Sequence, residues 1–246
     1  MTAFADFDQI RIINLPSRTD RRREMEGELR RVGLANDPRV EFVDGVLVED
    51  KAPFRAPGEK GVFLAHLNIL EAAAAAGASV LILEDDVDFT AAAQDWRPPV
   101  GADIAYGGYY ASDPSNLEKS DIIGAHCMGF SARAAQALVP FLSGLIDHQS
   151  PPPIDGAYVW FRRQQQGFVT HFATPTVAEQ RPSRSDIAQL RAVDRIKLIR
   201  GPISAARSLK RKLVRGQLTF GLREAVIVSI IGVAISTAAA YYHVRG

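Results

Sequence analysis

The sequence predicts an α/β fold, with one domain over residues 1–190, a basic helical segment over 191–224 and a hydrophobic helix over 225–242. Short β-branched runs alternate with longer helical patterns along the first part of the chain, which is the order of elements in α/β folds. The 246 residues are 47% hydrophobic, which is enough to bury a core. This length and composition argue against a disordered chain, a collagen-like chain and a polytopic membrane protein.

The predicted strands and helices follow one another in a regular order. Ser17 or Thr19 is expected to cap the first helix, and Gly33 and Gly77 are expected to end the first two helices. Strands are predicted at 10–15, 40–43, 80–83, 104–106 and 127–130, and helices at 19–32, 58–76, 131–142 and 154–165.

Cysteine use and the first residues indicate where the protein works. Cys127 is the single cysteine, so an intramolecular disulfide and a multi-cysteine metal cluster are excluded. Residues 1–9 are acidic and lack the basic start and apolar run of a secretory signal. We therefore expect the domain to face the cytosol.

Charge is distributed unevenly along the chain. Residues 184–246 carry 12 Lys and Arg against 3 Asp and Glu, and 225–242 carry no charge. At about 1.5 Å per residue the uncharged helix would reach roughly 27 Å, close to a thin bilayer core. We expect the basic segment to bind anionic lipid at the cytoplasmic face of the inner membrane, with the helix as an anchor. A buried core helix and an in-plane helix stay open as alternatives.

Two further expectations concern partners of this tail. The basic segment lacks interleaved aromatic side chains, so nucleic acid is not expected as a partner. Gly232, Ser236 and Ala240 recur every four residues, a spacing that would let two such helices pack closely in a homodimer.

Three consecutive acids, Glu84, Asp85 and Asp86, follow the predicted strand at 80–83. Ligands collect at the carboxyl ends of strands in α/β sheets, so these acids stand where a site is expected. Along an extended chain Glu84 and Asp86 would point one way and Asp85 the other. Two carboxylates on one side suit Mg²⁺ or Mn²⁺ holding a diphosphate. A solvated acidic loop, or the cap of a following helix, is the alternative.

Basic and histidine side chains supply the other candidates. Arg18 and Arg21 follow the first strand and could pair with phosphate, whereas Arg22 and Arg23 are expected on an exposed helix face. His171 and His126 are candidate metal ligands, of which His171 is favoured because it follows a strand late in the chain.

An ordered series of motifs resembles glycosyltransferase family 25, over about residues 10–187. These bacterial enzymes build lipooligosaccharide and related glycans, and collagen galactosyltransferase domains are their relatives. The matching motifs are Ile13-Asn14-Leu15, Arg18, Asp20-Arg21-Arg22, Val43-Asp44-Gly45, Gly58-Glu59-Lys60-Gly61 with Ala65-His66, Leu83-Glu84-Asp85-Asp86-Val87, Gly129-Phe130-Ser131, Pro153-Ile154-Asp155, and Gln180 with Ser185-Asp186-Ile187.

The resemblance implies a GT-A architecture, which is a single Rossmann-like domain that binds a nucleotide-sugar, most often a UDP-sugar. It implies metal-dependent, inverting transfer of a hexose to a lipid-linked bacterial surface glycan, with the acid triplet as a version of the DXD motif. We assign Glu84, Asp86 and His171 to the metal and Asp155 to the base on the acceptor hydroxyl. The residues assigned to the donor are Asn14, Arg18, Arg21, Asp44, Glu59, His66 and Asp85.

Other interpretations of these residues stay open. Asp155 would serve equally as a helix cap, and His66 as a buried core histidine. A catalytically silent subunit that binds sugar-nucleotide or glycan would keep the same motifs. A two-metal phosphohydrolase is disfavoured because the domain lacks a second acid cluster.

Overall fold

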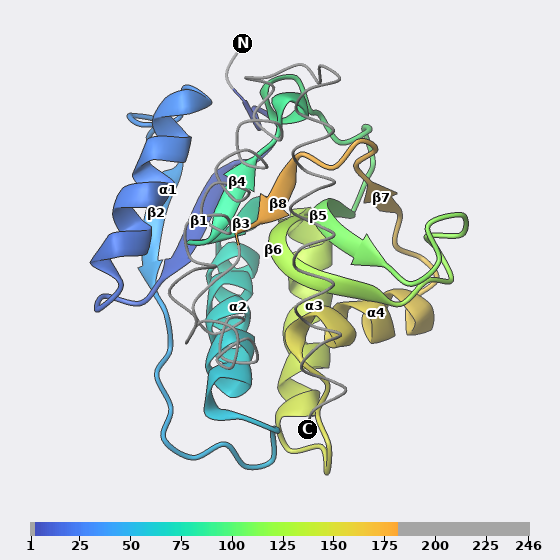
Figure 1. Ribbon diagram of the computed structural model, residues 1–246. Coiled ribbons are helices and arrows are strands. Elements are labelled where there is room, and N and C mark those ends of the chain that lie inside the picture. The colour runs from blue at the N-terminus through green and yellow to red at the C-terminus, as the bar shows by residue number, and fades with distance from the viewer. Residues whose placement is uncertain (1–2, 182–246) are drawn as a thin grey trace, which may run out of the picture. The chain divides into compact units, whose positions relative to one another are not determined.

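The computed structural model describes residues 3–181 (Figure 1). The predicted basic segment and hydrophobic helix lie outside these residues. Among residues 3–181, every helix is too short or too polar to cross a membrane.

The described domain is α/β, as the sequence predicts, and is built on a mixed six-stranded sheet. The strand order is β2-β1-β3-β6-β5-β7, and β6 runs antiparallel to both of its neighbours. A second, two-stranded antiparallel sheet pairs β4 with β8. The strands are β1 (Gln9–Asn14), β2 (Val40–Asp44), β3 (Val80–Glu84), β4 (Val87–Phe89), β5 (Ile104–Ala111), β6 (Ile122–Phe130), β7 (Thr170–Phe172) and β8 (Ala178–Gln180).

The first three strands of the large sheet form a Rossmann-like unit. Strand β1 pairs in parallel with both β2 and β3, and a helix joins each strand to the next. Parallel pairing of this kind needs a crossover, which the two helices supply. The carboxyl ends of β1 and β3 therefore meet at one edge of the sheet. The helices are α1 (Thr19–Arg31), α2 (Pro57–Ala76), α3 (Ala132–Ile146), α4 (Ile154–Gln164) and the 3₁₀ helix η1 (Ala91–Gln94).

The ends of the helices agree only in part with the caps that the sequence predicts. The residue before α1 is Arg18, and no side chain caps this helix, so neither Ser17 nor Thr19 has the expected role. Ser131 caps α3 by accepting a hydrogen bond from the Ala134 N–H at 3.1 Å. Gly77 ends α2 in the left-handed conformation that glycine adopts without strain.

Two apolar clusters lie on the two faces of the large sheet. One is formed mainly by α2, α3, α4 and the sheet residues that face them, and Figure 1 shows α2 and α3 side by side. The other is formed by α1, the residues before β1, and the β4–β8 ribbon. Strand β3 passes between the clusters, and Val80, Leu81, Ile82 and Leu83 are completely buried.

Strands β5 and β6 are longer than predicted because their hairpin continues past the core. Tyr110 pairs with Ile123 near its end, and both side chains are more than half exposed. Arg162 of α4 donates hydrogen bonds to the Leu117 and Ser120 carbonyls and so holds the connecting loop.

The close approach of α2 to the loop after β2 gives a first testable prediction. A Cβ on Gly61 would lie 2.3 Å from the Val46 carbonyl oxygen, whereas a Cβ on Gly144 of α3 would meet no atom within 4 Å. Gly61→Ala should therefore lower the free energy of unfolding by at least about 1 kcal/mol, because the loop must move. The matched helical control, Gly144→Ala, should raise it by roughly 0.5–1 kcal/mol. Urea unfolding of both variants measures this, and an equal effect of the two substitutions would contradict the close approach.

Candidate functional site

The three acids lie where strand β3 ends. The strand stops at Glu84, and Asp85 and Asp86 form a turn that leads into β4. Because the chain turns here, the expected alternation of side chains is wrong beyond Glu84. Arg21 lies close to both following acids, with its Nη1 atom 2.7 Å from Asp85 Oδ1 and 3.4 Å from Asp86 Oδ2.

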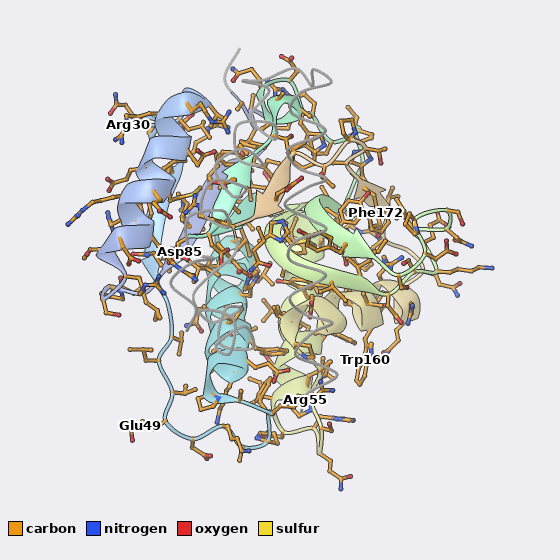
Figure 2. All side chains as sticks on the ribbon, viewed as in Figure 1. Arg30, Glu49, Arg55, Asp85, Trp160 and Phe172 are labelled. Atoms are coloured by element: carbon orange, nitrogen blue, oxygen red, sulfur yellow. The ribbon has the colours of Figure 1, made fainter. Side chains whose placement is uncertain are left out.

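Asp85 joins three elements of the domain. Its Oδ2 accepts a hydrogen bond from Asn14 Nδ2 at 2.7 Å, and its Oδ1 accepts one from Arg21. Asn14 ends β1 and Arg21 lies in the first turns of α1, so one buried carboxylate ties β1, α1 and the end of β3 together. Figure 2 labels Asp85 near the start of α1. Three of the predicted donor residues are thus neighbours that satisfy one another.

Asp86 is less well satisfied than Asp85. Its side chain is buried, and Gln180 Nε2 approaches Oδ2 at only 3.4 Å. Among the described residues Asp86 Oδ1 has no hydrogen-bond partner. Burial and the neighbouring Glu84 and Asp85 carboxylates raise the pKa of Asp86 to about 7, although Arg21 and Gln180 oppose this. A buried, repelled carboxylate is costly for the fold and is typical of functional sites.

Glu84 is surrounded by two histidines. Its side chain is 22% exposed, and its Oε1 lies 3.9 Å from Nε2 of the fully buried His66. The sheet register pairs Leu83 with Cys127, so the next residues, Glu84 and His126, are neighbours on β3 and β6. Burial raises the pKa of Glu84, but His66, His126 and Arg21 outweigh it and hold that pKa below its ordinary value.

Four other predicted residues lie around this cluster without contacting the acids. Arg18 is paired with Asp20 at 2.9 Å, and Asp44 is exposed at the end of β2, in register with Asn14. Glu59 is in the first turn of α2, seven residues before His66, or about 10 Å along the helix. Asp155 accepts hydrogen bonds from the N–H groups of Gly124 and Gly156, at 2.9 and 2.8 Å.

His171 lies away from the acids, contrary to its assignment beside Glu84 and Asp86. It pairs with Ala105 of β5, which is in register with Gly129 of β6 and, through it, with Leu81 of β3. Three strand spacings, about 14 Å, therefore separate β7 from β3. Figure 2 shows its neighbour Phe172 far across the sheet from Asp85, and His171 stacks on Trp96.

Several site residues were ranked low or passed over by the sequence prediction. His126 reaches Glu84 because β6 inserts antiparallel between β3 and β5, and no local pattern reveals that insertion. Gln180 reaches Asp86 because β8 pairs with β4. The motif match includes Gln180 but does not predict that Gln180 contacts Asp86. Tyr158 contacts His66, but the sequence alone identifies it only as one residue of a helix rich in aromatic side chains.

The residues present fit a cation whose remaining coordination positions are filled by oxygens of a bound ligand and of water. Among residues 3–181, no group of three or more His, Cys, Asp and Glu side chains is arranged to hold a metal ion. Glu84 and the unpartnered Asp86 oxygen supply two carboxylates. Mg²⁺ and Mn²⁺ are often bound by one or two carboxylates together with phosphate oxygens and water, so this donor set suits a cation carried by a diphosphate.

An apolar hollow of about 260 Å³ lies at the same end of the sheet as the acids, since Ile13 in its lining is in register with Glu84. It lies between α2 and the loop after β2, and it reaches the end of β1 on both sides of Asn14. No charged or polar side chain lines it. The lining residues are Ile13, Leu15, Gly45, Val46, Leu47, Val48, Pro57, Gly58, Gly61, Val62 and Ala65.

No protein-family model matches the chain, and no curated protein sequence matches it either. The likeness to glycosyltransferase family 25 therefore rests on the motifs alone.

The pKa of Asp86 yields a prediction on stability. Between pH 4 and 7 the folded protein holds a proton that the unfolded chain has released, so stability falls as the pH rises and the full cost is present above pH 7. Asp86→Asn removes this cost and should raise Tm at pH 8 by on the order of 5 °C, with a smaller gain at pH 5.

Differential scanning calorimetry at the two pH values measures this effect. Asp113→Asn is the control, because hydrogen bonds from Ser115 hold the pKa of the exposed Asp113 below its ordinary value. The control should not gain stability at pH 8. A lower Tm for Asp86→Asn at pH 8 would contradict the description of Asp86 as a strained carboxylate.

Proposed function

We propose that the described domain is a metal-dependent glycosyltransferase that moves a hexose from a nucleotide-sugar to a lipid-linked glycan. The observation that carries this proposal is the buried, unpartnered Asp86 oxygen beside Glu84 and Arg21, at the joined carboxyl ends of β1 and β3. Ligands collect at such strand ends in α/β sheets. The order of the family 25 motifs agrees with the same residues.

The donor diphosphate is assigned to the acids and the arginine beside them. Glu84 and Asp86 would hold Mn²⁺ or Mg²⁺, which supplies positive charge that stabilises the departing nucleoside diphosphate. Arg21 is partly exposed and has guanidinium N–H groups beyond the Nη1 that meets Asp85. These N–H groups, and those of Arg18, are suited to phosphate oxygens.

The apolar hollow beside Asn14 is assigned to the nucleobase. Its 260 Å³ and its lining of aliphatic side chains and glycine suit one face of a flat heterocycle, while backbone groups of residues 45–48 can meet the polar edge. Ile13 in its lining is in register with Glu84, so the hollow and the assigned metal ligand lie at the same end of the sheet, as a nucleotide that contacts both requires. A UDP-sugar is the donor we favour.

Asp155 is assigned to the acceptor side. In an inverting displacement the acceptor hydroxyl attacks the anomeric carbon, its proton passes to a base, and the nucleoside diphosphate leaves. The Gly124 and Gly156 N–H groups hold the Asp155 carboxylate in place, and the side chain is not fully buried. Asp155 lies in the first turn of α4, after the helix cap Pro153.

The chain beyond the described residues is assigned to the membrane. The basic segment at 191–224 would bind anionic lipid, and the helix at 225–242 would keep the enzyme at the cytoplasmic face, beside a lipid-linked acceptor. A homodimer through that helix belongs to the same proposal.

Binding and turnover of nucleotide-sugars test the proposal. We expect one donor among a panel of UDP-, GDP- and CMP-sugars to raise Tm in the presence of Mn²⁺, and the full chain to release the nucleoside diphosphate with an acceptor extract. Asp86→Asn should lose the Mn²⁺-dependent rise and at least about a hundredfold of the turnover, or roughly 3 kcal/mol of barrier.

The same measurements distinguish the glycosyltransferase from the second candidate function. A silent sugar-nucleotide-binding subunit would show the Mn²⁺-dependent rise in Tm without nucleotide release. If no donor raises Tm, with or without Mn²⁺, both candidates fail.

Asp155→Asn tests the base. It should leave the affinity for donor and Mn²⁺ unchanged and lower the turnover by about a hundredfold or more, as expected for a lost general base. Asp103→Asn is the control, because Asp103 is a buried acid with a structural role, held by Ser131, Arg133 and the Val169 N–H. It should lower stability and leave the turnover of folded protein unchanged. Normal turnover by Asp155→Asn would exclude Asp155 as the base.

A further inference from the structure

A histidine and a tyrosine form a hydrogen-bonded pair inside the core, behind the acids. His66 of α2 and Tyr158 of α4 are both completely buried. Their side chains meet at 2.9 Å between His66 Nδ1 and the Tyr158 hydroxyl oxygen, with the rings edge to face. The pair therefore links two helices that pack on the same face of the sheet.

The other ring nitrogen of His66 faces the site. Its Nε2 atom has no hydrogen-bond partner among the described residues, and the nearest carboxylate oxygen, Glu84 Oε1, is 3.9 Å away. That distance is too long for a direct hydrogen bond. Nε2 is itself buried, whereas Glu84 is the most exposed of the three acids, so Glu84 lies between the buried ring and the proposed ligand.

The negative charge of Glu84 determines whether the His66 Nε2 atom that faces it carries a proton. A bare Nε2 lone pair aimed at a carboxylate would be repelled, whereas an N–H would be attracted. The Tyr158 hydroxyl can donate to Nδ1, which leaves the imidazole proton on Nε2. Burial also raises the pKa of Tyr158 well above its ordinary value, so its hydroxyl keeps its proton.

We propose that Tyr158 is a positioning residue, whose hydroxyl holds the His66 ring so that Nε2–H is presented to Glu84 and orients its carboxylate. The consequence for a ligand rests on the proposed function, whereas the state of the ring does not. Groups that orient a ligating carboxylate in this way commonly change metal affinity by 10- to 100-fold when they are removed.

Tyr106 provides a matched control from the same apolar cluster. It is also completely buried, and its hydroxyl has no hydrogen-bond partner among the described residues. Its ring stacks on Phe172, with centroids 4.8 Å apart. Tyr106→Phe and Tyr158→Phe thus remove the same atom from the same core, but only Tyr158→Phe breaks the link to His66.

The first test uses ligand-free protein labelled with ¹⁵N-histidine. Long-range ¹H–¹⁵N spectra report which ring nitrogen carries the proton, and loss of one signal set in His66→Gln assigns His66. We expect a proton on Nε2 in the wild type and in Tyr106→Phe, and a changed distribution between the two nitrogens in Tyr158→Phe. A wild-type proton on Nδ1 alone, or an unchanged His66 signal in Tyr158→Phe, would overturn the proposal.

The second test measures Mn²⁺ affinity in the presence of UDP. Tyr158→Phe should weaken it by about tenfold or more, while Tyr106→Phe should leave it unchanged. His66→Gln should retain more affinity than His66→Asn, because a glutamine amide reaches the position of Nε2 and an asparagine amide that of Nδ1. Equal losses in the two His66 variants would overturn the role of Nε2.

The two tests fail in different ways. If the spectra agree with the proposal but wild-type protein does not bind UDP and Mn²⁺, the positioning of His66 stands and the proposed function fails. If wild-type protein binds both and Tyr158→Phe binds them equally well, the proposed function stands and the positioning role of Tyr158 fails.

Discussion

Three consecutive carboxylates, beginning with Glu84 at the end of β3, come directly after four completely buried residues of that strand. The structure around them depends on how each carboxylate is compensated. Asp85 is fully satisfied by Asn14 and Arg21. Glu84 lies between two histidines, while Asp86 has the fewest partners. Because the compensating groups come from β1, α1, α2, β6 and β8, the acids fix how these elements meet at one edge of the sheet.

This uneven compensation separates Asp85, which has a structural role, from Glu84 and Asp86, which we propose as ligand-binding acids. Asp85 has a hydrogen bond on each oxygen and ties the fold together. Among the described residues the atoms without partners include Asp86 Oδ1, His66 Nε2 and His126 Nδ1, all close to the end of β3 or to its neighbour β6. Native proteins leave few buried polar atoms unsatisfied. Other such atoms lie elsewhere in the described domain, but three of them around the end of β3 favour binding of a polar, charged ligand there.

The sequence predicted the parts of this site that depend on local pattern. The β1 and β3 runs, the helix after each of the first two strands and the acids at a strand exit all follow from periodicity and turn residues. The order of strands did not follow, because the antiparallel insertion of β6 is a long-range choice. It brings His126 to Glu84, and the β7 register keeps His171 three strands away. The link between His66 and Tyr158 depends in the same way on the packing of α4 against α2.

We propose that a cation and a nucleoside diphosphate bind together at Glu84 and Asp86. Electron paramagnetic resonance of free Mn²⁺, titrated with the full chain in the presence and absence of UDP, measures this most directly. UDP should tighten Mn²⁺ binding, and Mn²⁺ should tighten UDP binding by the same factor. Asp86→Asn should remove this coupling, and Asp113→Asn should retain it. Mn²⁺ binding that is indifferent to UDP, or that persists with full coupling in Asp86→Asn, would contradict the account.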